Sequence, residues 1–231
     1  MQQTKNTVIQ AYNTHWQLRS GDSQRLNAQR RTRYALKKLF NEIIQAPLRG
    51  NILDLGCGDG ALVRVLNELD EVHAQGLDIN HGVNFEADPL PYANNVFDIT
   101  LMYSVIEHLH NPGNILTELK RILKKSGYLI IITSNFDPAQ FLICDWKFYD
   151  DPTHVHPYNP TSLEHLLRLY QFHKRFIGLW TVPKTCYIWK LPMRWQFYIG
   201  AMLPFLGTKR FVPSFLKGKS KTMLCVFEND K

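Results

Sequence analysis

A glycine-rich loop that directly follows a short apolar run most constrains how this chain of 231 residues can fold. The apolar run is Ile52-Leu53-Asp54-Leu55, and the loop is Gly56-Cys57-Gly58-Asp59-Gly60. Glycines let the backbone turn sharply and let a ligand approach more closely than a Cβ atom would allow. The pattern therefore indicates a strand, a ligand-binding turn and a helix, which together form the first unit of an α/β fold.

The loop by itself leaves the identity of its ligand open. With Ala61 in the last position, it fits the dinucleotide pattern G-x-G-x-x-G/A, so both NAD and S-adenosylmethionine are candidates. Asp78 follows Gly60 by eighteen residues and ends the next predicted strand. A carboxylate at that place can accept hydrogen bonds from both hydroxyl groups of a ribose. We therefore expect a ligand that contains adenosine.

The rest of the chain alternates between strand and helix patterns. An amphipathic, basic helix is expected at residues 24–45, ahead of the glycine loop. Strands are expected at 51–55, 72–78, 83–86, 96–102, 128–133, 172–180 and 222–228, and helices at 60–69, from Pro112 to Lys125, and at 161–170. We expect Thr161 or Ser162 to cap the last helix. This alternation predicts a parallel sheet.

The formal charge of +7 is unevenly distributed along the chain. Residues 1–50 carry nine Lys/Arg against two Asp/Glu, and residues 181–231 carry the same numbers. The middle, residues 51–180, holds nine basic and sixteen acidic residues. The two basic flanks could attract phosphates, anionic lipid or nucleic acid, and a solvated basic face explains them equally well.

Residues 182–220 precede the last predicted strand and are rich in aromatic and basic side chains. Three interpretations remain open for this insertion: a lid over an apolar acceptor, a segment that lies on anionic lipid through residues 185–220, or a folded helical cap. Nucleic acid is a less favoured partner, because the chain contains no recognised RNA-binding motif.

The cysteines and the N-terminus bear on the cellular compartment. The four cysteines are far apart and form no CxxC pair, which predicts reduced thiols and no zinc site. The N-terminus lacks the apolar core of a signal peptide. We expect a cytoplasmic protein, peripheral to the inner face of the membrane if the insertion binds lipid.

Further motifs follow the glycine loop in a fixed order. They are Leu77-Asp78-Ile79-Asn80, Asp88-Pro89-Leu90-Pro91, Tyr103-Ser104-Val105-Ile106-Glu107-His108-Leu109 and the segment 119–131. Over roughly residues 50–180, their order and spacing resemble the class I (Rossmann-like) S-adenosylmethionine-dependent methyltransferases of the small-molecule type. The resemblance implies a doubly wound, seven-stranded, mostly parallel sheet in one methyltransferase domain. Its expected parts are an N-terminal helical cap (1–48), a cofactor-binding core (49–181), the insertion (182–220) and a final strand (221–231).

The same resemblance implies a set of residues that bind S-adenosylmethionine. The expected set is Asp54, Gly56, Cys57, Gly58, Gly60, Asp78, Ile79, Asp88 and Tyr103. Asp54 would anchor the ammonium group of the cofactor, Asp78 the ribose, and Asp88 the adenine amino group. Ile79 would cover one face of the adenine, and Tyr103 would lie near the activated methyl group.

Three histidines, His108, His154 and His156, are candidate general bases. A sulfonium methyl group is already electrophilic, so a base is needed only for an acceptor that holds its proton tightly, such as an alcohol. Each histidine could instead have a structural role, such as tethering a loop. Glu107-His108 is similar to the end of the metal-binding Glu-x-x-Glu-His cluster of ubiquinone-pathway O-methyltransferases. Because Ser104 replaces the first Glu, we expect no metal.

The resemblance implies methyl transfer from S-adenosylmethionine, which we expect to reach an oxygen atom of a small or amphiphilic acceptor. A lipid-linked or cell-surface glycan precursor is the preferred acceptor class, because the basic and aromatic insertion would suit one. Two alternatives remain open. One is an NAD-dependent oxidoreductase, and the other is a membrane-surface or nucleic-acid-binding protein whose cofactor pocket is idle.

Overall fold

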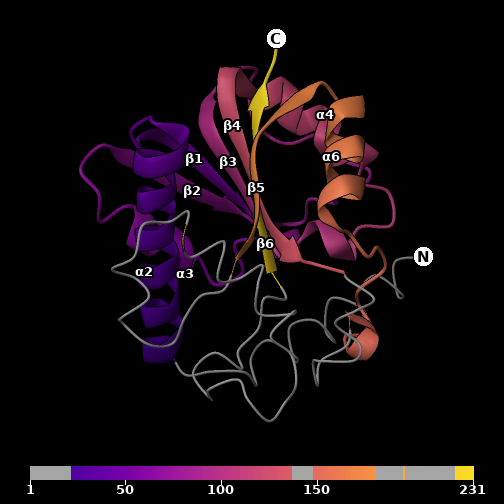
Figure 1. Ribbon diagram of the computed structural model, residues 1–231, viewed down its shortest axis with the longest axis horizontal. Helices are drawn as coiled ribbons and strands as arrows, with labels where there is room; N and C mark the ends of the chain where they lie inside the picture. Colours follow the sequence, from indigo (N-terminus) through magenta and orange to yellow (C-terminus); the bar gives the residue numbers. More distant parts are fainter. Residues whose placement is uncertain (1–21, 137–147, 181–194, 196–221) are drawn as a thin grey trace.

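The computed structural model describes residues 22–136, 148–180, 195 and 222–231 of the chain, and these residues form a six-stranded sheet with helices on both faces (Figure 1). The strands are β1 (Gly50–Leu55), β2 (Val72–Leu77), β3 (Phe97–Tyr103), β4 (Leu123–Ser134), β5 (Phe172–Trp180) and β6 (Thr222–Asn229). Their order in the sheet is β2-β1-β3-β4-β6-β5. The first four strands in this order are parallel, and β6 runs antiparallel to both of its neighbours.

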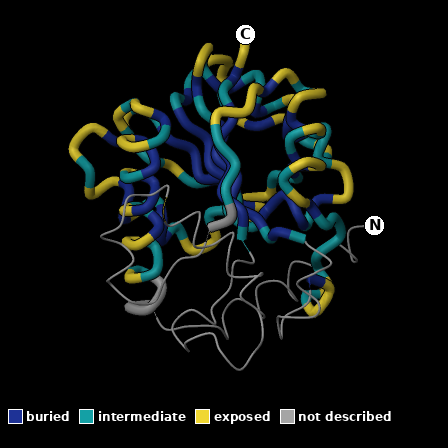
Figure 2. Tube along the Cα trace, in the orientation of Figure 1, coloured by how far each residue is buried: buried dark blue, intermediate teal, exposed yellow. Residues whose placement is uncertain are grey.

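Helices α2 (Asp22–Leu39) and α3 (Ala61–Leu66) cover one face of the sheet, and α4 (Gly113–Ile122) and α6 (Pro160–Leu169) cover the other (Figure 1). Alternate residues of a strand point to opposite faces. Ile52 of β1 therefore packs in the core cluster under α2 and α3, whereas Leu53 and Leu55 pack in the cluster under α4 and α6. The strands are buried from both sides, as Figure 2 shows, which explains their nearly continuous apolar sequences.

The expected N-terminal helix is confirmed over its described part. It runs as α2 and ends in a π-helical turn, η1 (Phe40–Ile44). Arg33 of α2 donates a hydrogen bond from Nη1 to the carbonyl oxygen of Val65 at 2.7 Å, and both Arg30 and Arg33 contact the carboxylate of Glu68. The basic face of this helix is therefore partly used to attach it to the end of α3.

The prediction of a strand at 83–86 is wrong. These residues form turns, because Asn84 and Asp88 satisfy their backbone groups locally. The backbone N–H of Asn84 donates to Oδ2 of Asp88 at 2.7 Å, and the N–H groups of Ala87 and Asp88 donate to the carbonyl of Asn84 at 3.0 and 2.8 Å. Such local bonds compete with strand pairing. The described sheet consequently has six strands where the resemblance implied seven.

The end of one helix and the capping residue of another also differ from the prediction. Helix α4 ends at Ile122, and the residues through Lys125 belong to β4, because Leu123 pairs with Phe97 and Nζ of Lys124 contacts both carboxylate oxygens of Asp98 at 2.8 and 2.9 Å. Helix α6 is capped by Asn159 and not by Thr161 or Ser162. The Asn159 side chain accepts a hydrogen bond from the Ser162 N–H at 2.8 Å, and the Ser162 hydroxyl accepts one from the Asn159 N–H at 2.9 Å.

Most of the expected insertion, and the first part of the expected N-terminal cap, lie outside the described residues. Within the insertion only Trp195 is described, and its side chain is exposed. Among the described helices, none combines the length and the apolar character that crossing a bilayer requires.

One buried side chain, Asn229 of β6, holds the junction between α4 and β4. Its Nδ2 donates to the carbonyl oxygens of Lys120, Leu123 and Lys124 at 3.4, 3.1 and 3.0 Å. Asn229 is fully buried. Carbonyl groups that lose such a donor inside the protein stay unpaired, since water does not reach them.

We therefore expect Asn229→Leu to lower the free energy of unfolding by about 2 to 4 kcal/mol in urea denaturation. Asn67→Leu is the matched control, because Asn67 bonds the backbone N–H and carbonyl of Ala74 at an exposed position where water replaces the lost bonds. It should cost less than about 1 kcal/mol. Equal losses in the two variants would show that burial of the Asn229 bonds adds nothing.

Candidate functional site

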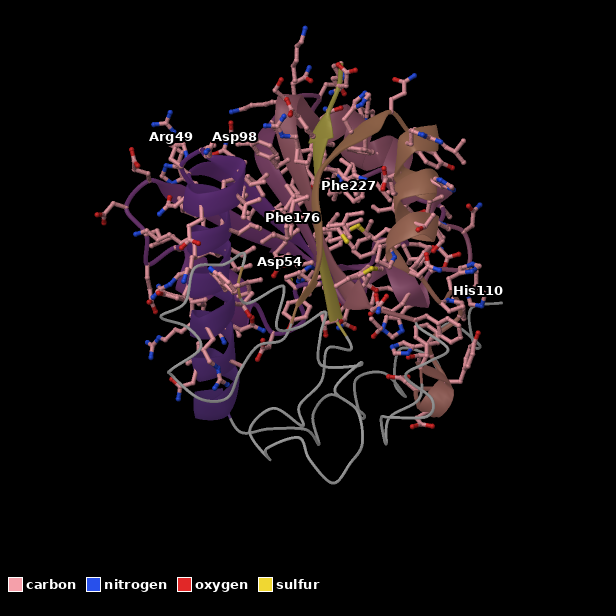
Figure 3. The ribbon with its side chains drawn as sticks, in the orientation of Figure 1. Arg49, Asp54, Asp98, His110, Phe176 and Phe227 are labelled. Atoms are coloured by element: carbon pink, nitrogen blue, oxygen red, sulfur yellow. The ribbon has the colours of Figure 1, made fainter. Side chains whose placement is uncertain are left out.

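The candidate site lies at the carboxyl ends of β1 and β2, next to the point where the strand order reverses. β1 is flanked by β2 on one side and by β3 on the other, so the connections that follow these strands diverge. In open α/β sheets, ligands bind in the crevice outside such a reversal. Figure 3 shows Asp54 toward the carboxyl ends of these strands, whereas Arg49 and Asp98 lie toward the amino ends.

The glycine loop has the backbone that its sequence predicted. Gly56, Gly58 and Gly60 have φ angles of +73°, +55° and +71°, in the left-handed region that favours glycine. A Cβ atom on Gly56 would lie 2.3 Å from Cγ2 of Val105, so this glycine is required for packing. A Cβ atom on Gly58 would meet no described atom within 4 Å. The backbone at Gly58 is therefore open to a ligand.

Asp78 joins the glycine loop to the end of β2. Its Oδ2 accepts a hydrogen bond from the Gly58 N–H at 3.0 Å, and its Oδ1 accepts one from the Asn80 N–H at 3.1 Å. This side chain is buried and caps the short helix η2 (Ile79–His81). A carboxylate has about four lone-pair sites, so Asp78 can still accept bonds from a ribose. Ile79 beside it is 40% exposed, as a residue that covers an adenine face needs to be.

Asp54 is a buried carboxylate directly behind the loop. Only 2% of it is exposed, and burial, followed by the negative charge of Asp78, raises its pKa to about 7. The neighbouring thiol of Cys57 also has its pKa raised to about 12, by burial and then by Asp54 and Asp78. The Cys57 thiol is therefore neutral at physiological pH. Two acidic groups close together, one of them deeply buried, favour a cationic ligand.

Asp88 ends the 84–88 turn. Its Oδ2 already accepts a hydrogen bond from the Asn84 N–H. The side chain of Asn114 in α4 donates to the carbonyl oxygens of Phe85 and Asp88 at 3.1 and 3.0 Å. The turn is thus attached to α4. Its contact with an adenine amino group stays a prediction.

Tyr103 lies at the carboxyl end of β3, as expected. Burial and the nearby charge of Glu107 raise the pKa of its hydroxyl, while a hydrogen bond with Thr32 of α2 lowers it. Thr32 is 3% exposed. Sequence reasoning missed Thr32, whose only signal was a polar residue on the apolar face of the predicted helix.

The structure brings two of the three candidate histidines together. The rings of His108, in η3 (Ile106–His108), and of His154 have centroids 4.8 Å apart. Nδ1 of His154 donates to the carbonyl of Phe148, in η4 (Phe148–Asp150), at 2.7 Å, and His154 stacks on the Phe148 ring. His156 does not join them, because its Nε2 donates to the carbonyl of His110 at 3.0 Å.

The burial of Glu107 beside His154 is the feature that sequence reasoning missed at this position. It is 1% exposed, and neither of its carboxylate oxygens accepts a hydrogen bond from a described residue. Glu107, His108 and His154 each offer an atom that could bind a metal, and these atoms lie within 4.8 Å of one another. The sequence signals were the similarity of Glu107-His108 to a metal-binding motif and the apolar pair Val105-Ile106 before it, and neither indicated His154.

Comparisons with known proteins identify the family. The methyltransferase domain family matches residues 26–175, which is well over half of the chain. A ubiquinone biosynthesis O-methyltransferase of Cereibacter sphaeroides is 28% identical over 158 residues, covering 56% of this chain and 64% of that protein. An uncharacterized protein of Methanocaldococcus jannaschii is 29% identical over 115 residues, covering 45% of this chain and 50% of that protein. The matches thus span about half to two thirds of these relatives.

Solved structures show the same fold. A putative methyltransferase of Haloferax volcanii, solved in complex with the Trm112 methyltransferase activator, has a TM-score of 0.59 at 14% identity and covers 91% of this chain and 95% of its own. A SAM-dependent methyltransferase of Archaeoglobus fulgidus has a TM-score of 0.52 at 20% identity and covers 85% and 94%. With the family match and the glycine loop, these findings establish that the chain belongs to the methyltransferase domain family, in the class I group that uses S-adenosylmethionine.

Proposed function

We propose that this protein transfers the methyl group of S-adenosylmethionine to an oxygen atom of a small or amphiphilic acceptor. The observation that carries the proposal is the buried pair Asp54 and Asp78 beside the open backbone of Gly58. S-adenosylmethionine carries an ammonium and a sulfonium group, whose positive charges would offset the cost of burying Asp54. NAD carries two phosphates, which this acidic pair would repel. The family match also favours S-adenosylmethionine over the NAD alternative.

In the proposed reaction, an acceptor oxygen attacks the sulfonium methyl group in line with the carbon–sulfur bond. The new oxygen–carbon bond forms as the carbon–sulfur bond breaks, and S-adenosylhomocysteine leaves. The proton of the acceptor passes to a base or to water. Burial lowers the pKa of His108, against the opposing effect of the nearby Glu107. The base roles of His108, His154 and His156 stay predictions.

Oxygen as the methylated atom is supported by the relatives named as ubiquinone biosynthesis O-methyltransferases. The acceptor class, a lipid-linked or cell-surface glycan precursor, rests on the composition of residues 182–220, and so does membrane contact. The test is transfer of a labelled methyl group from S-adenosylmethionine to fractionated lipid and polar extracts, with the product assigned by NMR. A methyl group on nitrogen or carbon would contradict the proposal. Lipid binding without any transfer would favour the idle-pocket alternative.

Replacement of Gly58 tests the cofactor position. We expect Gly58→Arg to abolish measurable binding of S-adenosylmethionine in calorimetry, because the new side chain enters the ligand space. The matched control is Gly82→Arg, since both glycines have positive φ angles and an added Cβ on either meets nothing within 4 Å. Both variants should carry a similar backbone strain of about 1 to 3 kcal/mol. Full binding by Gly58→Arg would place the cofactor elsewhere.

The raised pKa of Asp54 predicts that cofactor binding depends on pH. Because the ammonium group pairs with the ionised carboxylate, the affinity for S-adenosylmethionine should rise about tenfold between pH 6 and pH 8, through the pKa of about 7. Asp54→Asn should bind more weakly and lose this dependence. Asp70→Asn, a substitution at an exposed carboxylate, should retain it. A wild-type affinity that is constant from pH 6 to pH 8 would contradict the prediction.

The free protein should show the opposite trend in stability. A folded-state pKa raised from 3.8 to about 7 gives stability that is present below pH 4 and lost as the pH rises through 7. The free energy of unfolding of Asp54→Asn, relative to that of wild type, should therefore rise from pH 5 to pH 8 by on the order of a few kcal/mol. Urea denaturation without cofactor at both pH values measures this difference.

A further inference from the structure

We propose that Glu107, His108 and His154 form a binding site for one divalent transition-metal ion of the zinc or cobalt type. The three residues come from two segments that are distant in the sequence. Glu107 and His108 belong to η3, which follows β3, whereas His154 follows η4. Their candidate ligand atoms lie within 4.8 Å of one another, so small side-chain movements would bring all three onto one ion.

The backbone holds the two segments together. The carbonyl oxygen of Glu107 accepts hydrogen bonds from the N–H groups of Val155 and His156 at 2.9 and 3.2 Å. The backbone of Glu107 is therefore hydrogen-bonded directly to the segment that follows His154. Such an attachment fixes the distance between the two halves of the site before any ion binds.

The Glu107 carboxylate indicates a cation. It is 1% exposed, and neither of its oxygens accepts a hydrogen bond from the described part of the chain. A buried, unpaired carboxylate is strongly unfavourable, so buried charges are normally paired or bound to a metal. A cation held by Glu107 and the nitrogen atoms of the two histidines would compensate this charge.

The histidines are held as metal ligands usually are. Nδ1 of His108 donates to the carbonyl of Thr153 at 3.0 Å, and Nδ1 of His154 donates to the carbonyl of Phe148 at 2.7 Å. When Nδ1 carries the proton, the lone pair of the ring is on Nε2. Metal-binding histidines typically bond a backbone carbonyl through their other nitrogen, which fixes the tautomer and the ring orientation.

Asp151 adds negative charge at the edge of this cluster. Its Oδ1 accepts hydrogen bonds from the N–H and hydroxyl of Thr153 at 3.0 and 2.6 Å. Its Oδ2 lies 4.0 Å from Nε2 of His154. The cluster therefore combines two imidazoles with a buried carboxylate and a second carboxylate nearby.

The donor set selects the class of metal. Two imidazoles and one carboxylate suit Zn²⁺, Co²⁺ or Fe²⁺, whereas Mg²⁺ and Ca²⁺ prefer oxygen ligands alone. Our sequence-based expectation of no metal rested on Ser104, which stands where a Glu would supply a ligand. The structure brings His154 to the cluster from another loop. Metal binding here does not depend on the proposed methyl transfer, although an ion in this place could also bind an acceptor oxygen.

The test begins with tag-free, full-length protein that has been stripped with a chelator. Calorimetry with Zn²⁺ should show one ion per chain, and Co²⁺ should give visible d–d absorption bands of a nitrogen and oxygen site. Mg²⁺ at millimolar concentration should not displace the Co²⁺ bands. Absence of stoichiometric Zn²⁺ binding, or displacement by Mg²⁺, would overturn the proposal.

Variants locate the ion. Glu107→Gln and His154→Gln should each weaken Zn²⁺ binding by more than about 100-fold, since even outer-shell partners change metal affinity by about 10- to 100-fold. The matched controls Glu71→Gln and His165→Gln replace exposed residues of the same types and should bind Zn²⁺ like wild type. Wild-type affinity in both site variants would refute the assignment.

Two further measurements separate metal loss from misfolding. Circular dichroism should be retained in the site variants, and so should S-adenosylmethionine binding, because Asp54, Asp78 and the glycine loop lie at the ends of β1 and β2. If Glu107→Gln does not fold, His108→Gln and His154→Gln decide the question by the same titration. Zn²⁺ binding without methyl transfer would leave this inference standing while the proposed function fails, and transfer without Zn²⁺ binding would do the reverse.

Discussion

The hydrogen bond between the Gly58 N–H and the Asp78 carboxylate is the interaction on which the proposed cofactor site depends. It fixes the glycine loop against the end of β2, and it keeps an ionisable group close to buried Asp54. The resulting concentration of negative charge opposes folding of the free protein above neutral pH. The same charge favours a cationic ligand. Stability and ligand affinity therefore depend on the same carboxylates in opposite ways.

The sequence predicted the elements whose signals are local. Glycine positions in the loop and alternating apolar strands reflect backbone geometry and burial, which a short window of residues records. The strand at 83–86 was wrong, because the side chains of Asn84 and Asp88 form turns that compete with pairing. The end of α4 was also misplaced, since the lysine-rich pattern continues the helix while the pairing of Leu123 with Phe97 in β3 ends it.

The histidine cluster shows what a sequence motif omits. Ser104 stands where the related motif has a Glu, so the local motif lacks one expected ligand. Nothing in this motif indicates that His154 lies beside His108. That proximity depends on the bonds between the Glu107 carbonyl and the segment 155–156, which are tertiary contacts. By contrast, the proximity of Asp54 and Asp78, the proposed cofactor residues, follows from the sequence, because neighbouring parallel strands end at the same side of a sheet.

The position of β6 between β4 and β5 has a consequence for synthesis of the protein. β5 emerges from the ribosome before β6, yet its only partner among the described strands is β6, and the intervening segment is about forty residues long. β5 therefore has no pairing partner while the ribosome adds that segment. This takes several seconds at roughly 5 to 20 residues per second. Asn229 then joins the late strand to the α4–β4 junction. During translation, the strands that lack a partner are therefore at the side of the sheet opposite β2 and the glycine loop.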